Sequence, residues 1–427
     1  MISNWASTTF RALGNPGYRI LWTGSTLAFL AFAMMSVVQS VVAFDLTGKN
    51  GSVGAVALGM GIAQISIAPF GGVLADRLPK RRLLLIGQSM LGLTFLAVAL
   101  LITTGHITIL WLAVSTFIMG GVFSFIGPAR TAWIGEILPG PRMANGIALQ
   151  QLAMTSTRIF GPFVAGAAIG IAFLGTAGAY YIMASLFVFV VGSIWLVPGG
   201  RVARAGSGRS ILGDLKMGVD HVRDRPRLLL LALAFIGFIM AGFSYQTILP
   251  GYLENALGES PKRVALLYGV SAIAGLAATV LLAGMSDTRR AFKLMMLAGL
   301  LMAVALAGMA VAPNLLAAVG AMLLVGIATS SYQLLNNSLV MQEADPVYHG
   351  RVMSLVMLAW GVNGIVALPF GMLADRFGER ETLAVMAILV LAVSALTFSW
   401  YTMLTRRERG VLALSASADV PARTGGA

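Results

Sequence analysis

The sequence predicts an all-α membrane protein with twelve transmembrane helices in two six-helix bundles. Hydrophobic residues make up 58% of the 427 positions and charged residues only 11%, whereas a water-facing globular domain carries roughly 25% charged residues. The mean hydropathy is +0.87. The apolar runs reach about 20 residues, which suits helices that cross a bilayer, and they exceed the roughly 10-residue alternating strands of a membrane barrel.

The apolar runs set the order of the helices. The first residues lack the apolar core of a cleavable signal peptide, so we expect the first helix to begin near Tyr18. The N-terminal bundle, 1–197, is expected to hold helices at 18–46, 52–75, 82–103, 107–134, 143–172 and 176–197. The C-terminal bundle, 228–405, is expected to hold helices at 228–256, 262–284, 292–312, 314–341, 352–374 and 381–404.

A basic linker separates the two bundles. Segment 198–227 opens with a Pro-Gly-Gly sequence and contains seven basic residues. Within it, 211–225 spaces apolar residues among charges in a pattern that predicts a short amphipathic helix on the inner membrane surface. The tail, 406–427, is small and polar after about residue 410 and is expected to be irregular.

The distribution of charge predicts the orientation. With the N-terminus in the cytosol, twelve helices return the C-terminus to the same side. In this arrangement 23 of the 29 Lys and Arg residues fall in cytosolic segments and five fall outside, as the positive-inside rule requires. The net charge of +13 therefore belongs to the cytosolic loops, and we expect no nucleic-acid partner.

Several kinds of chemistry are missing from the sequence. There is no cysteine, and the three histidines lie outside the apolar runs, so we expect no disulfide and no metal site. No loop of the form G-x-x-x-x-G-K-[ST] is present. We therefore expect no cofactor and no enzyme activity, and a gradient must supply the energy for any transport.

The two halves of the chain repeat each other. Residues 72–81 (GVLADRLPKR) follow the second helix, and residues 284–290 (GMSDTRR) follow the eighth helix at the matching place. Glu136 and Glu343 occupy matching positions at the inner ends of the fourth and tenth helices. Parallel repeats of this kind are typical of transporters whose binding site lies between two bundles.

On these residues the chain resembles the major facilitator superfamily. The loop motif of that family, G-x-x-x-D-R-x-G-R-[KR], matches residues 72–81 except that Pro79 replaces the second glycine. The sequences DLTG at 45–48, RIFGP at 158–162 and GRVMS at 350–354 are most similar to the branch of enterobactin exporters and macrolide-efflux proteins. GPFVAG at 161–166 partly matches a motif of proton-coupled drug antiporters, but Thr116 stands where their fourth helix carries an arginine.

The resemblance implies a gate at the inner ends of the helices. Its candidates are Asp76, Arg77, Lys80, Arg81, Glu136, Asp287 and Glu343. In this interpretation Asp76 and Arg77 close the gate by pairing with the eleventh helix or with helix-end dipoles; in the alternative, these charges only fix the topology. Residues 371–380 (GMLADRFGER) read like the same motif but fall on the outer side, so we interpret them as a local turn and helix-end charge pattern.

Arg158 is the least ordinary residue in the apolar runs. It lies about 15 residues into the fifth helix, and a lipid-facing guanidinium at such depth costs at least about 2.5 kcal/mol. Two interpretations stay open: Arg158 lines the cavity and favours anionic or zwitterionic substrates, or it bonds backbone carbonyls near the Gly161-Pro162 break.

Other polar residues in the apolar runs are candidates for the cavity, since such groups usually face the interior. They are Gln39, Gln64, Tyr245, Gln246, Gln333, Asn336, Trp360 and Asn363. Trp360 lies well inside its helix and is a candidate to stack on substrate. Asp45 and Glu254, near the outer ends, are candidates for proton coupling, although Asp45 is equally suited to ending the first helix.

The sequence thus predicts a monomeric secondary transporter in the inner membrane of a bacterium. Its expected activity is the export of an amphipathic organic molecule, drug-like or siderophore-like, by alternating access and proton antiport. The expected partners are a small-molecule substrate, protons and membrane lipids. The alternatives are a uniporter, an importer or a lipid flippase of the same fold, and, with less support, a membrane receptor or enzyme.

Overall fold

Long apolar helices dominate the structure, a computed structural model that describes residues 10–418 apart from 172, 199–210, 283–287 and 346–347. Within these residues, the structure does not describe the side chains at 68–77, 141, 211–212, 214–215, 288–289, 350–351, 354, 357 and 407–418. Within the described part, twelve helices are long and apolar enough to cross a membrane. This confirms the predicted fold class.

The first half contributes six spanning helices. They are α2 (Pro16–Asp45), α3 (Asn50–Arg77), α4 (Lys80–Thr103), α5 (Ile109–Ile137), α6 (Pro141–Gly170) and α7 (Gly175–Leu196). Local capping fixes where they begin: the Asn15 side chain accepts a hydrogen bond from the backbone N–H of Tyr18, and the Thr108 side chain accepts one from Trp111. All six begin and end within a few residues of the predicted bounds.

The second half contributes six more spans. The first is broken into α9 (Pro226–Gly242), α10 (Tyr245–Gly251) and a π-helical turn at Tyr252–Ala256. The others are α11 (Val264–Leu282), α12 (Thr288–Val311), α13 (Leu315–Glu343), α14 (His349–Phe377) and α15 (Glu379–Ala418). Two expectations are corrected here. The helix predicted at 228–256 is interrupted, and α15 continues through the segment that we expected to become irregular after residue 410.

The amphipathic helix predicted at 211–225 is present as α8 (Ile211–Arg223). Its His221 ring stacks on the Tyr348 ring with centroids 4.1 Å apart. Arg225, between α8 and α9, donates to the Asp345 carboxylate at 2.6 Å and to the Glu343 carbonyl at 2.8 Å. These contacts attach the described part of the linker to the second half of the molecule.

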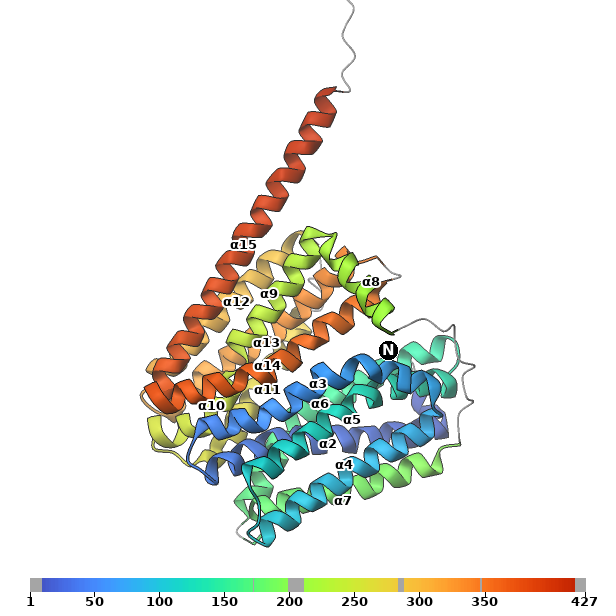
Figure 1. Cartoon of the computed structure of the whole chain (residues 1–427), viewed down its shortest axis with the longest axis vertical. Helices are drawn as coiled ribbons and strands as arrows, with labels where there is room; N and C mark the ends of the chain where they lie inside the picture. The colour runs from blue at the N-terminus through green and yellow to red at the C-terminus, as the bar shows by residue number, and fades with distance from the viewer. Residues whose placement is uncertain (1–9, 172, 199–210, 283–287, 346–347, 419–427) are drawn as a thin grey trace, which may run out of the picture.

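Helices α2–α7 form one group and α9–α15 another, with α3 and α14 side by side at the boundary (Figure 1). We call the end that carries α8 and the start of α2 the α8 end, and the opposite end, where α10 lies, the far end. In Figure 1 the axes of α3 and α14 lie close at the far end and separate toward α8. Helices α6 and α11 form a second contact between the halves.

Glycines let α3 and α14 approach closely. A Cβ on Gly54 would lie 2.6 Å from the Ala367 carbonyl oxygen, and one on Gly364 would lie 2.7 Å from the Cα of Gly61. Small residues at such a seam allow backbone-to-backbone packing where lipid offers no hydrophobic driving force. The two helices run antiparallel, so the first turn of α3 meets the last turns of α14.

Candidate functional site

Arg158 on α6 lies between the two halves. Successive residues of a helix are about 100° apart, so the Arg158 side chain leaves α6 in a direction between those of Gly161 and Gly166. A Cβ on Gly161 would contact Ala33 of α2, and one on Gly166 would contact Ala265 of α11. Arg158 therefore points between an N-terminal helix and a C-terminal helix. Its side chain is exposed, although surrounding protein atoms partly desolvate the guanidinium.

The partner that faces Arg158 is a tyrosine from the other half. Tyr245, the first residue of α10, interacts electrostatically with Arg158. The Gln246 and Ser271 side chains lie near the Tyr245 hydroxyl. Within the described part of the chain, no carboxylate forms an ion pair with Arg158. The structure thus brings together Arg158, Tyr245 and Gln246, three of the predicted cavity residues, and leaves the arginine charge uncompensated.

Other predicted cavity residues are more enclosed. Gln39 is half-buried, and its Oε1 has no hydrogen-bond donor among the described atoms. Asn336 is fully buried, and neither its Nδ2 nor its Oδ1 is bonded there. Gln64 and Gln333 are half-buried, and a Cβ on Gly361 of α14 would lie 3.3 Å from the Gln64 Cβ. Gln64 therefore lies at the α3–α14 seam.

Trp360 and Asn363 pack within the second half. The Trp360 ring meets the Phe243 ring edge to face, with centroids 4.8 Å apart and an interplanar angle of 82°. Ser244 donates to the Asn363 side-chain oxygen at 3.3 Å. Both contacts lie at the break between α9 and α10, so these two residues support the break that positions Tyr245.

The described gate candidates contact their own halves. Arg81 donates to the Trp195 carbonyl at 2.6 Å, which ties α4 to α7. Glu136 is exposed and interacts electrostatically with Lys80, while Glu343 lies 3.6 Å from Arg227. Asp76 and Arg77 end α3, but their side chains are outside the description, and Asp287 lies outside the described residues. The predicted inner gate thus stays a prediction.

Both candidates for proton coupling lie at the far end. Asp45 ends α2 and Glu254 lies in the π-helical turn, and both side chains are exposed. Asp45 interacts electrostatically with Lys262 and with Glu254, both from the second half. These groups are close enough to influence one another, and no described hydrogen bond or ion pair connects them to Arg158.

Sequence reasoning missed a second arginine within the helices. We counted Arg130 with the cytosolic charges, but it is buried in α5, with its guanidinium 5.0 Å from the centre of the Phe29 ring of α2. It forms no ion pair with a carboxylate in the described part of the chain. Its position inside the predicted helix 107–134 was the signal that could have separated it from the loop charges.

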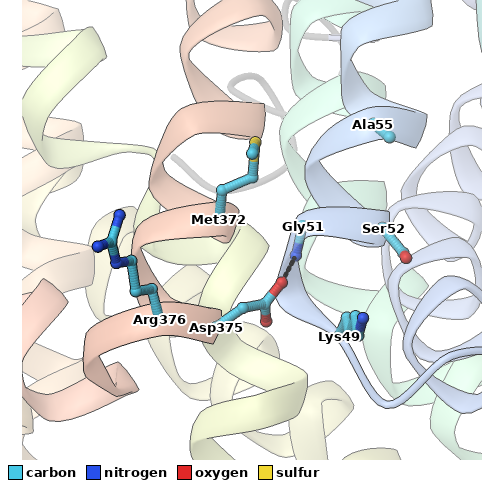
Figure 2. Close-up of a pocket in the computed structure, with 7 residues that line it drawn as sticks. All are labelled: Lys49, Gly51, Ser52, Ala55, Met372, Asp375 and Arg376. Atoms are coloured by element: carbon cyan, nitrogen blue, oxygen red, sulfur yellow. Dashed lines mark hydrogen bonds between the residues drawn. The ribbon is translucent and has the colours of Figure 1, made fainter.

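A pocket of about 420 Å³ opens on the far end of the seam, away from Arg158. Figure 2 shows it between α3 and α14, with the Asp375 carboxylate pointing at the first turn of α3. Its lining residues are Lys49, Gly51, Ser52, Ala55, Met372, Asp375 and Arg376. The expectation that 371–380 is only a local pattern is therefore wrong, because Asp375 bonds across the two halves.

Twelve membrane-spanning helices in two halves, with polar side chains between them, define a two-bundle membrane transporter. Residues 21–368 match the Major Facilitator Superfamily. The chain belongs to that family.

Two curated relatives are named as multidrug resistance proteins. Multidrug resistance protein 2 of Bacillus subtilis (strain 168) is 24% identical over 272 residues, which cover 62% of this chain and 65% of that protein, just under two thirds of its length. Multidrug resistance protein MdtH of Yersinia pestis (strain Pestoides F) is 26% identical over 293 residues, covering 68% of this chain and 69% of that protein.

Among solved structures, the nucleoside transporter NupG superposes with a TM-score of 0.73. The match covers 90% of this chain and 99% of NupG at 16% identity. At that level of identity the likeness establishes the fold alone.

Proposed function

We propose that this chain exports an amphipathic organic molecule that carries an acidic or zwitterionic group, by alternating access between its two halves. The observation that carries the proposal is the exposed Arg158 side chain, which points between the halves without a carboxylate partner in the described structure. An uncompensated cation between apolar helices attracts an anion more strongly than a cation in bulk water does. Tyr245 and Gln246 supply neutral polar groups beside it.

The proposed direction is outward, with the α8 end in the cytoplasm of a bacterial inner membrane. The excess of basic residues in the segments at the α8 end supports this orientation. The two relatives named as multidrug resistance proteins support efflux of organic molecules. We propose proton antiport as the energy source and a monomer as the working unit.

Transport by purified protein in proteoliposomes tests the proposal. The substrate panel pairs a permanently anionic aryl sulfonate with a quaternary ammonium compound of the same size, so that neither redistributes passively with pH. Under an imposed pH gradient, we expect the sulfonate to accumulate in the more acidic compartment and the ammonium compound to move little. No gradient-driven movement of any anionic or zwitterionic amphiphile would contradict the proposal.

Arg158→Gln tests the role of the arginine in the same assay. A hydrogen bond to a charged group contributes about 1.5–3 kcal/mol, so we expect the apparent affinity for the sulfonate to fall roughly 10- to 100-fold. Arg158→Lys keeps the charge and should retain part of the anion preference. A folded Arg158→Gln protein with an unchanged ratio of anion to cation transport would remove Arg158 from the substrate site.

A further inference from the structure

The far end of the α3–α14 seam carries a cluster of side-chain contacts between the halves. Asp375, near the end of α14, accepts hydrogen bonds from the backbone N–H groups of Asn50 at 2.7 Å and Gly51 at 2.8 Å. These are the first two residues of α3. The Asp375 carboxylate thus occupies the positive end of a helix that belongs to the other half, where a negative charge is favoured.

A second carboxylate extends the same contact inward. Glu379 is 7% exposed and begins α15, and its Oε1 accepts hydrogen bonds from the side chains of Asn50 at 2.9 Å and Asn255 at 2.7 Å. Asn50 belongs to the first half and Asn255 to the second. Gly378, with a φ of +100°, lets the chain turn between α14 and α15 so that both carboxylates face Asn50.

The backbone around this cluster is shaped to admit it. A Cβ on Gly51 would lie 2.8 Å from Asp375 Oδ2, and one on Gly251 of α10 would clash with the Asn50 side chain. A Cβ on Gly371 would lie 2.5 Å from the Asn50 carbonyl oxygen. Three elements therefore leave room for Asn50 and the carboxylates in this arrangement of the halves.

Among the described side chains, no similar cluster joins the halves at the α8 end. Across these residues, the side-chain hydrogen bonds between the first and second halves are the three that involve Asn50 and Gly51. The ion pairs at the α8 end, Arg225 with Asp345 and Arg227 with Glu343, stay within the second half. The described contacts thus hold the halves together at the far end.

We propose that Asp375 and Glu379 form a far-end latch, which stabilises the state closed at the far end and must release Asn50 and Gly51 before that end opens. Separation of the halves would expose two N–H groups at the start of α3 to water, and the cost is moderate since water can solvate them. The sequence GMLADR at 371–376 repeats GVLADR at 72–77, so each of two antiparallel helices ends with the same acidic residue.

Distance measurements between spin labels test the latch without any substrate, so the test is independent of the proposed function. The chain contains no cysteine, and His106→Cys with Pro313→Cys places labels on exposed far-end loops of the two halves. In the full-length protein in lipid nanodiscs, we expect a dominant short distance. Asp375→Ala should raise the ratio of the long to the short population about tenfold, the effect of losing a helix cap and its charge.

A second variant disrupts the contact between Asp375 and the start of α3 by changing α3 instead of Asp375. Gly51→Ala keeps the Asp375 charge but places a Cβ where the carboxylate lies, so it should produce a similar shift. Because both substitutions remove the same interaction, the double variant should shift the ratio no further than either single variant.

Glu259→Gln is the matched control. It removes a far-end carboxylate that pairs with Arg263 at 2.6 Å within the second half, so its distances should match those of the parent.

Unchanged distances in folded Asp375→Ala and Gly51→Ala would overturn the latch, as would an equal shift in Glu259→Gln. If Asp375→Ala does not fold, the Gly51→Ala result decides alone.

Discussion

At the scale of single residues, the described arginines differ in the groups that bind their guanidinium. Arg81, Arg225 and Arg380 each donate to backbone carbonyls, whereas Arg158 and Arg130 have neither a carboxylate nor a carbonyl partner in the described part of the chain. Arg130 faces the Phe29 ring and is buried. Arg158 is exposed between the halves, which makes it able to meet a soluble anion there.

Substitution of Asp76 tests the predicted inner gate. We expect Asp76→Asn to lower the transport rate about fivefold while leaving the amount of folded protein nearly unchanged, because a charge at a helix end contributes about 1 kcal/mol to a gate and little to the fold. Initial rates normalised to monodisperse protein measure this. Asp220→Asn, at an exposed carboxylate on α8, is the control. Equal behaviour of the two variants would reduce the 72–81 motif to a topological signal.

The site could be predicted from sequence only where single residues stand out. Arg158 could be found because a cation deep in an apolar run is costly wherever it points. The bonds of Asp375 and Glu379 to Asn50 could not be predicted from sequence. They join positions 325 and 329 residues apart and depend on how the halves dock. For the same reason, sequence could not show that Trp360 packs against Phe243.

At the scale of elements, the α3–α14 seam governs how the halves meet at the far end. Gly364→Leu should push α14 away from α3, because a Cβ there would already lie 2.7 Å from the backbone of Gly61. Overpacking of this kind costs about 1–3 kcal/mol, so we expect the far-end closed population to fall about tenfold or more. Cross-linking of a far-end cysteine pair measures that population.

Gly320→Leu is the control for the seam, since a Cβ on Gly320 of α13 would meet nothing within 4 Å. It should leave cross-linking unchanged. Equal cross-linking in the Gly364→Leu protein would show that the seam does not need close backbone contact.

Element order and bounds were predictable because length and hydropathy fix membrane helices. The break between α9 and α10 was not. It falls at Phe243 and Ser244, where a run of four polar residues (244–247) begins, but a short polar run without proline does not by itself end a membrane helix. Contacts of Trp360 and Asn363 from α14 accompany the break, and these arise from packing. Packing also could not be predicted for α8: its amphipathic pattern predicted a helix, but not that Arg225 beside it would bind Asp345.

At the scale of the whole molecule, the side-chain hydrogen bonds between the halves that the structure describes all lie at the far end. These bonds close the far end, and the Arg158 side chain is exposed between the halves. A transporter in this arrangement should offer Arg158 to water from the α8 end. With the proposed orientation, that end is cytoplasmic, which suits loading of an exported substrate.

Thiol labelling at position 158 tests this central claim most directly. Arg158→Cys in the cysteine-free chain should react with a charged, membrane-impermeant thiol reagent added to the cytoplasmic face of inverted vesicles, and much more slowly when the reagent is added to the outside of intact cells. Val188→Cys is the control: Val188 of α7 is 71% exposed, and the substituted thiol should react from neither side because lipid covers it. Rapid labelling of Arg158→Cys from the cytoplasmic face is the predicted result; no labelling from either face, as for Val188→Cys, would contradict a water-filled pathway at Arg158.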